Sequence, residues 1–472
     1  MKLRVLLGLG LALLAGACGG EKRPAQRVVV IGADGLEWRV LRPLLQQGKC
    51  PNLRALMERG SFGNLRTMIP TLSPILWTTI ATGKPPEEHG ILGFTDENLQ
   101  QYTSTMRKVR ALWNIADRCE LESSVHGWWN TWPVEELRGH MVAGSSSSEL
   151  AEANWKPALI PGAERQVWPL ELEPRVMAMA QEHGTLAQVQ ALATTRIFGR
   201  FAPGELGEVE QELIRQTLWS VQADMTYAAI AEELLRTDPG DLNMVYFGGT
   251  DVISHRFWRY YEPQAFRWPA DPQLESRMAG PKAQVLLARA IDNYYEWFDE
   301  LLGRLLQAAG DDATVLVISD HGFHAHSIDK PNPLFITGHH LDGPAGVFIA
   351  AGPGIVQRGD VAAFLERNEL ADCGHILSIA PTVLALLGLA RGADMADEAF
   401  VAVLDERARK SALLAPVPTH DTGFRRARAT EVPAGMKTDF VKRFQQLGYI
   451  GSDGQDANLP PQPQPPQQQP PR

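Results

Sequence analysis

Acidic and imidazole side chains recur in this sequence at positions where metal chemistry could be built. Asp34, Asp251 and Asp320 each follow a short apolar segment, in "RVVVIGAD", "LNMVYFGGTD" and "TVLVISDHG". His321 comes directly after the third aspartate, and His255 follows the second by four residues. The four-residue spacing places Asp251 and His255 on one face of a helix. Carboxylates and imidazoles are metal-type ligands, so the pattern predicts a metal site.

A serine hydroxyl stands at a second informative place. Ser73 precedes Pro74 in "MIPTLSPILWTTIATG", immediately before a helix-like apolar run. Serine before a helix with proline at its first position is a common cap. A helix N-terminus also attracts phosphate, and a hydroxyl held there can attack it. We expect Ser73 to be both the cap and the nucleophile.

Each of these residues has an ordinary structural explanation when taken alone. Asp34 before Gly35 could be a turn residue, Asp251 a helix cap, and Ser73 only a cap. Taken together, five Asp and His residues near three strand ends, one further histidine (His340, in "TGHHLDGPAGVF") and one hydroxyl are difficult to explain by packing. The combination favours a single catalytic site.

The elements that must position these residues alternate along the chain. Short apolar runs rich in β-branched residues predict buried strands, and runs with helical spacing predict helices between them. The expected strands are 27–34, 242–251, 314–322 and 346–355, and the expected helices are 51–60, 75–83, 284–310 and 376–389. This order predicts an α/β sandwich around a mostly parallel sheet, with ligands beyond the carboxyl ends of the strands.

Several motifs resemble one known family when read in order. They are "GADG", "PTLSPILWTTIATGKPPEEHGI", "TDVISHRFW", "SDHGF", "GHH" with "GVFIAAGPGI", and "SIAPTVLALLGL", spread over residues 27 to 390. In these the chain resembles the type I phosphodiesterase/nucleotide pyrophosphatase family of the alkaline phosphatase superfamily. The resemblance implies an alkaline-phosphatase-like sandwich with helices on both faces of the sheet, and inserted loops or a cap.

The resemblance also implies a set of site residues. Family members use two zinc ions, which other divalent cations could replace, bridged by the substrate phosphate. One ion would bind Asp34, Ser73, Asp320 and His321, and the other Asp251, His255 and His340. The gap between His340 and Gly346 is longer than the family pattern, so His339 remains an alternative ligand. Lys84, in "GKPPEEHGI", is a candidate substrate contact.

These residues predict a hydrolase of small-molecule phosphoric esters that acts through a phosphoseryl intermediate. Nucleotide-cleaving relatives usually carry threonine as the nucleophile, and monoesterases keep an arginine just after it. "SPILW" has neither, which favours phosphodiesters. The alternatives are a phosphomonoesterase or phosphonate hydrolase, and a non-catalytic surface lipoprotein. The aromatic stretch "GWWNTWPVEE" (127–136) could stack a substrate ring, although packing at a sheet edge is the expected role.

Composition and the chain ends predict where such an enzyme works. A net charge of −10 excludes a nucleic-acid polymer as the main partner. Residues 1–18 read as a lipoprotein-type signal ending at Cys18, which predicts a lipid anchor in a bacterial cell envelope, at the periplasmic side of the outer membrane, or a periplasmic protein. Cys50, Cys119 and Cys373 allow at most one bridge, and the oligomeric state is not indicated.

The expected domain organisation follows from these segments. A linker (19–26) leads to a catalytic domain (27–415), which carries less regular insertions at about 145–215 and 260–282. A C-terminal extension (416–456) and a disordered Pro/Gln-rich tail (457–472) complete the chain.

Overall fold

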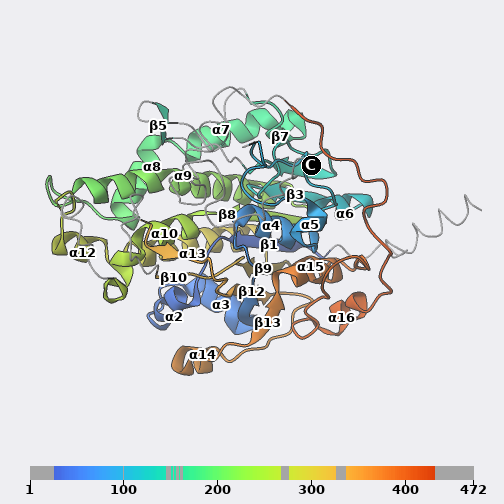
Figure 1. Ribbon diagram of the computed structural model, residues 1–472. Helices are drawn as coiled ribbons and strands as arrows, with labels where there is room; N and C mark the ends of the chain where they lie inside the picture. The colour runs from blue at the N-terminus through green and yellow to red at the C-terminus, as the bar shows by residue number, and fades with distance from the viewer. Residues whose placement is uncertain are drawn as a thin grey trace, which may run out of the picture.

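A nine-stranded sheet forms the centre of the molecule in the computed structural model (Figure 1). The structure describes residues 26–98, 100–144, 150–151, 154–155, 159, 163–266, 276–325 and 336–430. The predicted lipoprotein signal, the linker before Gln26 and the Pro/Gln-rich tail lie outside the described residues. Among the described helices, none combines the length and the apolarity needed to cross a bilayer.

The strands are adjacent in the order β13-β2-β12-β9-β1-β8-β3-β4-β7. Their bounds are β1 (Val28–Ala33), β2 (Gly60–Arg66), β3 (Ser123–His126), β4 (Gly139–Val142), β7 (Val167–Trp168), β8 (Leu242–Phe247), β9 (Thr314–Ile318), β12 (Gly346–Ala351) and β13 (Asp372–His375). Two small hairpin sheets pair β5 (Leu150–Ala151) with β6 (Asn154–Trp155), and β10 (His324–Ala325) with β11 (Gly338–His339).

The direction of the strands decides which residues meet at one edge of the sheet. β1 lies between β8 and β9 and is parallel to both, so all three end at the same edge. β12 is antiparallel to β9 and to β2. Residues that follow β1, β2, β8 and β9 therefore meet residues that precede β12. Such an edge is where open α/β sheets bind ligands.

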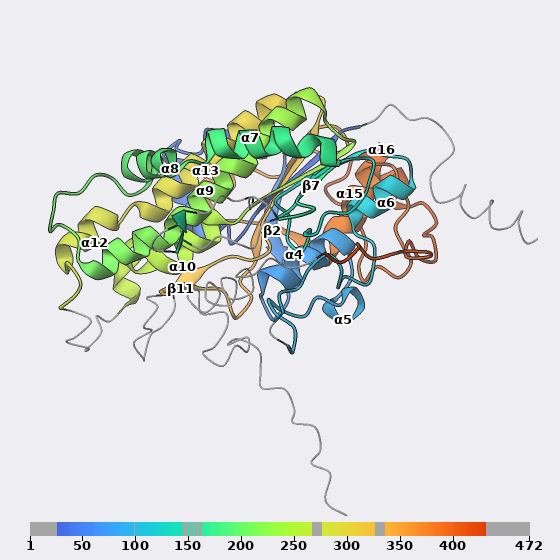
Figure 2. The same ribbon diagram turned by 90° about the horizontal axis from the view of Figure 1, so that it is seen from above.

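Both faces of the sheet are buried, because alternate strand residues enter two different cores. In β1, Val29 and Ile31 pack on one side and Val28 and Val30 on the other. Figure 2 shows helices on both sides of the strands. The first core receives α2 (Trp38–Gln46), α3 (Pro51–Arg59), α9 (Glu208–Thr237), α10 (Gly249–Tyr261) and α13 (Ala290–Ala309). The second receives α4 (Ser73–Thr82), α6 (Leu112–Arg118), α15 (Ile379–Leu386) and α16 (Glu406–Ala412).

This arrangement confirms the predicted α/β fold with a mostly parallel sheet between helical layers. The predicted helix 284–310 is divided into α12 (Pro281–Leu287) and α13, and the late helix 376–389 begins with a 3₁₀ turn, Ile376–Ser378. Cys50, Cys119 and Cys373 are free thiols.

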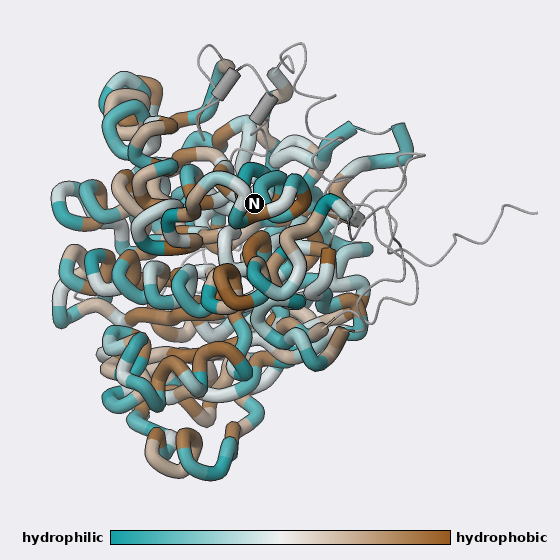
Figure 3. Tube along the Cα trace, turned by 90° about the vertical axis from the view of Figure 1, so that its left-hand side faces the viewer, coloured by the Kyte–Doolittle hydropathy of each residue, from teal (hydrophilic) through white to brown (hydrophobic). Residues whose placement is uncertain are grey.

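The stretch described from sequence as a less regular insertion is largely helical in its second half. α7 (Glu173–His183), α8 (Leu186–Leu192) and the long α9 occupy it, with a short π-helical segment, Ala193–Ile197, after α8. Along such helices hydrophilic and hydrophobic turns alternate in Figure 3, as expected where one face lies on the core.

Candidate active site

Six predicted ligands meet at the edge where β1, β8 and β9 end. Asp34 follows β1, and Asp320 and His321 follow β9. Asp251 and His255 lie one turn apart on α10, which begins directly after β8. His340 precedes β12, and because that strand is antiparallel, the residues before it reach the same edge. All six side chains are buried, with relative exposures between 0% and 5%.

One group of ligands gathers around His321. Its Nε2 lies 3.3 Å from Asp34 Oδ1 and 3.5 Å from Asp320 Oδ2. These three atoms are buried, yet none of them makes a hydrogen bond of good geometry. The other imidazole nitrogen, Nδ1, donates to the carbonyl of Gly322 at 3.1 Å, which leaves Nε2 to face the two carboxylates.

A second group gathers around Asp251. Its Oδ1 lies 3.3 Å from His255 Nε2 and 3.6 Å from His340 Nε2, and the two imidazole nitrogens are 3.2 Å apart. His255 Nδ1 donates to the carbonyl of Gly338 at 2.8 Å, so its Nε2 lone pair also faces the group. The rings of His340 and His321 stack with centroids 3.6 Å apart, so the two groups adjoin each other.

The choice between two adjacent histidines is decided by the short strand β11. His339 pairs across the hairpin with His324, and its ligand atoms lie near Asp342 instead. The next residue, His340, points to the opposite side and reaches Asp251 and His321. Alternation of side chains along an extended backbone therefore places His340, and not His339, in the buried centre.

The carboxylate of Asp34 is held by two neutral donors that the sequence did not identify. Trp77 Nε1 donates to Asp34 Oδ2 at 3.0 Å, and the hydroxyl of Tyr246 donates to the same oxygen at 2.5 Å. Trp77 lies one helical turn after Ser73, and Tyr246 is on β8. With Oδ2 occupied in this way, Oδ1 is left to face His321.

The electrostatics show that this centre has an excess of negative charge. Burial raises the pKa of Asp320 well above its ordinary value, and the nearby carboxylate of Asp34 adds to the shift. Burial alone would lower the pKa of His321, but the charges of Asp320 and Asp34 raise it to about 10. Burial would also raise the pKa of Asp34, but contacts with His321, Tyr246 and Trp77 hold it below its usual range. The carboxylates thus stabilise a positive charge among them.

Two glycines keep the backbone close enough for this assembly. Gly35 has φ +64°, and a Cβ there would lie 2.7 Å from the Phe323 ring. A Cβ on Gly249 would lie 1.6 Å from the hydroxyl oxygen of Tyr294. Side chains at these positions would force apart the segments that carry Asp34 and Asp251.

Ser73 lies at the start of α4 and lines the same pocket as Asp34 and Asp251. It is the first helical residue, and Leu72 occupies the N-cap position without a side-chain cap hydrogen bond. The expectation that Ser73 also caps the helix is therefore wrong. Every residue of this ten-residue helix is buried, and Ser73 at its N-terminal end lines the pocket.

Lys84 lies elsewhere. Its ammonium contacts Asp394 at 2.5 Å and Asp421 at 2.7 Å, with Glu88 at 3.8 Å, and only 6% of the side chain is exposed. It is not among the residues that line the pocket beside Ser73. The geometry gives Lys84 a role in joining the segment after α4 to residues on both sides of α16.

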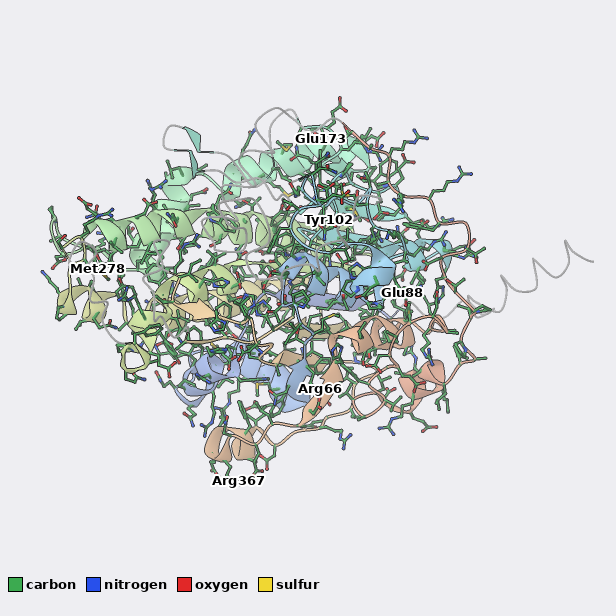
Figure 4. The ribbon with its side chains drawn as sticks, in the orientation of Figure 1. Arg66, Glu88, Tyr102, Glu173, Met278 and Arg367 are labelled. Carbon is green, nitrogen blue, oxygen red and sulfur yellow. The ribbon has the colours of Figure 1, made fainter. Side chains whose placement is uncertain are left out.

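Aromatic side chains form much of the lining of the pocket. They are Phe94, Tyr102, Trp129, Trp132, Trp219, Tyr227 and Tyr246, and Tyr102 can be located in Figure 4. Trp129 and Trp132 belong to the "GWWNTWP" stretch, whereas Trp128 is buried in the core. The sequence predicted sheet-edge packing for these tryptophans, and only the fold shows that two of them face the pocket.

A buried carboxylate in α9 supports the helix that carries Asp251 and His255. Asp224 accepts hydrogen bonds from the backbone amides of Gly248 and Gly249, each at 3.1 Å, and from the hydroxyl of Tyr294 at 2.9 Å. It thereby serves the N-terminus of α10 as a cap supplied by another helix. Burial raises the pKa of Asp224 to about 7. No local sequence pattern links residue 224 to this site, so the sequence missed it.

The residues present fit a pair of divalent cations. Buried carboxylate and imidazole atoms converge in two adjoining groups, and in the first of them Asp34 Oδ1, Asp320 Oδ2 and His321 Nε2 lack hydrogen bonds of good geometry. Three carboxylates with three imidazoles form a donor set that suits Zn²⁺ and related ions. The hydrogen bonds of His255 and His321 to backbone carbonyls orient their rings in the way that metal-ligating histidines usually show.

Comparison with known proteins gives a family assignment. Among curated proteins, none matches this chain. Solved structures that are similar include BT1596, a 2-O GAG sulfatase, at 14% identity and a TM-score of 0.48, with 80% of this chain and 73% of that chain covered. Human ectonucleotide pyrophosphatase/phosphodiesterase 5 is 14% identical, with a TM-score of 0.40 and coverages of 77% and 96%. A mutant of the alkaline phosphatase PafA is 13% identical, with a TM-score of 0.46 and coverages of 82% and 100%.

The family itself is identified by a sequence model rather than by these distant structures. The model describes type I phosphodiesterases and nucleotide pyrophosphatases, and it matches residues 28–369. That range includes Ser73 and all six residues of the buried acidic and imidazole centre. This chain belongs to the type I phosphodiesterase/nucleotide pyrophosphatase family.

Proposed function

We propose that this protein hydrolyses phosphodiesters, with Ser73 as the nucleophile and two divalent cations, zinc in the first place, as cofactors. The observation that carries the proposal is that Ser73 lines one pocket with Asp34 and Asp251, which belong to the two adjoining carboxylate and imidazole groups at this edge of the sheet. Asp34, Asp320, His321 and Ser73 would hold one cation. Asp251, His255 and His340 would hold the other.

The bound cations would supply Lewis-acid charge that favours the alkoxide of Ser73 and neutralises the phosphoryl oxygens. Ser73 Oγ loses its proton and attacks phosphorus, and the bond from phosphorus to the leaving alcohol breaks. A phosphoserine ester results. Water then attacks phosphorus, the bond to Ser73 Oγ breaks, and a phosphate monoester leaves.

The helix that begins at Ser73 contributes to the same chemistry. Pro74 has no amide hydrogen, and the amides of Ile75 and Leu76 both donate to the carbonyl of Leu72, which leaves the amide of Ser73 to donate to a phosphoryl oxygen. The partial positive charge at a helix N-terminus adds to this stabilisation. α4 is buried along its whole length, so packing holds its N-terminus in place before the substrate arrives.

The charge of the pocket favours diesters over monoesters. Of the described residues that line it, none is lysine, arginine or histidine, and the charged members are Asp34, Asp224 and Asp251. A monoester dianion would lack the basic partner that its second charge needs, whereas a diester carries a single charge. A phosphonate monoester also carries a single charge, so phosphonate ester hydrolysis is the second candidate.

We further propose that the mature protein is anchored through a lipid on Cys18 at the periplasmic side of the bacterial outer membrane. The support is the sequence of residues 1–18 alone. Metabolic labelling with a radioactive fatty acid should mark the wild type, and Cys18→Ala should remain unlabelled. A labelled Cys18→Ala protein would contradict the anchor.

The catalytic proposal can be tested with purified protein and 4-nitrophenyl esters. Wild-type protein should hold two zinc ions per chain and cleave a 4-nitrophenyl phosphodiester faster than 4-nitrophenyl phosphate. EDTA and Ser73→Ala should each abolish turnover, and Ser411→Ala, a control on α16 outside the pocket, should keep it. Full activity in Ser73→Ala would overturn the mechanism. Absence of bound metal with no turnover would instead support a non-catalytic lipoprotein.

A further inference from the structure

A second cluster of metal-type side chains lies on the outer side of the β10–β11 hairpin. His324 of β10 and His339 of β11 are direct partners across the antiparallel pair, so their imidazoles lie on the same face of the hairpin. The two rings meet edge to face with centroids 4.3 Å apart. Both are partly exposed. The neighbouring side chains Phe323 and His340 are buried, as alternation along an extended backbone requires.

Asp342 completes this outer cluster from the turn that follows β11. Its carboxylate contacts His324 Nε2, and one ligand atom from each of His324, His339 and Asp342 lies within 4.8 Å of the other two. Ligand bonds of about 2 Å place donor atoms up to about 4 Å apart around one ion, so small side-chain rotations would bring the three together. Asp342 is free to make such a rotation, because 67% of its side chain is exposed.

The ring of His324 already has the orientation of a metal ligand. Its Nδ1 donates to the carbonyl of Ala325 at 3.0 Å, so Nε2 is the nitrogen that faces Asp342. The same arrangement, with Nδ1 on a backbone carbonyl and Nε2 toward a carboxylate, orients His255 and His321 in the buried centre.

His339 is oriented differently, and this difference sets the strength of the site. Its Nδ1 accepts a hydrogen bond from the backbone amide of Leu341 at 3.0 Å. A neutral imidazole that binds a cation through Nε2 carries its proton on Nδ1, and one that binds through Nδ1 has no lone pair left there. Either mode breaks the bond to Leu341. We therefore expect the outer cluster to bind a cation more weakly than the buried centre does.

The surface beside the outer cluster favours cations. A groove lined by His324 also contains the carboxylates of Glu37, Glu262 and Asp342 and one guanidinium, that of Arg39. Arg39 lies 3.7 Å from Glu262 and balances only that charge. The carboxylates outnumber the basic side chains among the described lining residues, so the local potential attracts positive ions.

We propose that His324, His339 and Asp342 bind a third divalent cation, of the class to which Zn²⁺ belongs. Two imidazoles and one carboxylate are ligands that such ions prefer, and the exposed side of the cluster leaves room for water in the remaining positions. The ion would tie both strands of the hairpin to the turn after β11, and so brace the segment that carries His340. The site is separate from the proposed catalysis, because none of its three residues lines the Ser73 pocket.

The test counts zinc on the full-length protein under two conditions. The protein is dialysed to equilibrium against increasing free zinc, and bound zinc is measured by elemental analysis before and after gel filtration into metal-free buffer. The wild type should bind three ions at saturating zinc and keep two after gel filtration, because the outer cluster is the weaker site. A wild type that never exceeds two ions would overturn the proposal.

The variants assign the third ion to the outer cluster. His324→Ala and His339→Ala should each bind one ion fewer than the wild type at dialysis equilibrium and keep the same number after gel filtration. Asp342→Asn should need several-fold more free zinc to bind its last ion. His183→Ala, a control at an exposed histidine on α7, should match the wild type throughout.

The outcomes separate this inference from the proposed catalytic centre. Equal zinc counts for wild type, His324→Ala and His339→Ala at every zinc concentration would overturn the outer site and leave His324 and Asp342 as an ion pair only. A difference of one ion between wild type and His324→Ala, with no zinc retained by either after gel filtration, would keep the outer site and overturn the proposed two-zinc centre.

Discussion

Replacement of Tyr246 by phenylalanine tests whether the hydrogen bonds around Asp34 hold a metal ligand in place. The change removes one hydroxyl and keeps the ring that packs against Trp77 and Trp129. In the wild type this hydroxyl donates to Asp34 Oδ2 over 2.5 Å, and Asp34 is 1% exposed. Water therefore has little access to replace the lost donor, and only Trp77 Nε1 would remain on that oxygen.

The expected size of the effect follows from the type of bond. A hydrogen bond to an ionised, buried carboxylate contributes about 2 kcal/mol. At about 1.4 kcal/mol for each factor of ten, the loss corresponds to an affinity for zinc that is about 30-fold weaker. This agrees with the roughly 10- to 100-fold losses of metal affinity or activity seen when hydrogen-bond partners of metal ligands are removed.

The assay is a competition of the metal-free protein with a chromogenic chelator for zinc, in parallel with turnover at increasing zinc concentration. Tyr246→Phe should need about 30-fold more free zinc for half-occupancy of its weaker site, and excess zinc should restore much of the turnover. Tyr227→Phe is the matched control, because its hydroxyl lies in the same pocket but bonds to the carbonyl of Ala143. Identical zinc affinities for wild type and Tyr246→Phe would refute the reasoning.

Three further predictions concern Lys84, Asp224 and the pair His339 and His340. Lys84→Met should lower the free energy of unfolding by about 2 kcal/mol, because two partly buried carboxylates lose their ammonium partner. A raised KM at unchanged stability would contradict this and would indicate that Lys84 contacts the substrate. Burial raises the pKa of Asp224 to about 7, so the folded wild type keeps a proton that the unfolded chain releases near pH 4. As the pH rises from about 4 to about 7, the free energy of unfolding of the wild type should therefore fall by roughly 4 kcal/mol relative to that of Asp224→Asn, and the difference should stay level above pH 7. Urea unfolding of both proteins at pH 5 and pH 8 measures this, and the same stability difference at both pH values would contradict the prediction. His340→Ala should reduce bound zinc from two ions to one per chain, while His339→Ala should keep two, as measured by elemental analysis; the reverse result would contradict the assignment from β11.

The sequence by itself was sufficient to predict the architecture and the main constellation. Strands such as Val28–Ala33 and Thr314–Ile318 are short apolar runs followed by a candidate metal ligand, and that local pattern is visible without a structure. The spacing of Asp251 and His255 likewise fixes their common face once the segment is helical. These features depend on neighbours in the chain, so the residues themselves are enough to reveal them.

The roles of several side chains became visible only in the tertiary structure, because they depend on contacts between segments that are distant in the sequence. Trp77, Tyr246 and Asp224 gained their roles because α4, β8 and α9 bring them to Asp34 and to the start of α10. The choice of His340 over His339 came from the direction of β12 and the pairing of β11. The carboxylate partners of Lys84, Asp394 and Asp421, lie more than 300 positions away in the sequence. Such partners are set by strand order and helix packing, which no short stretch of sequence encodes.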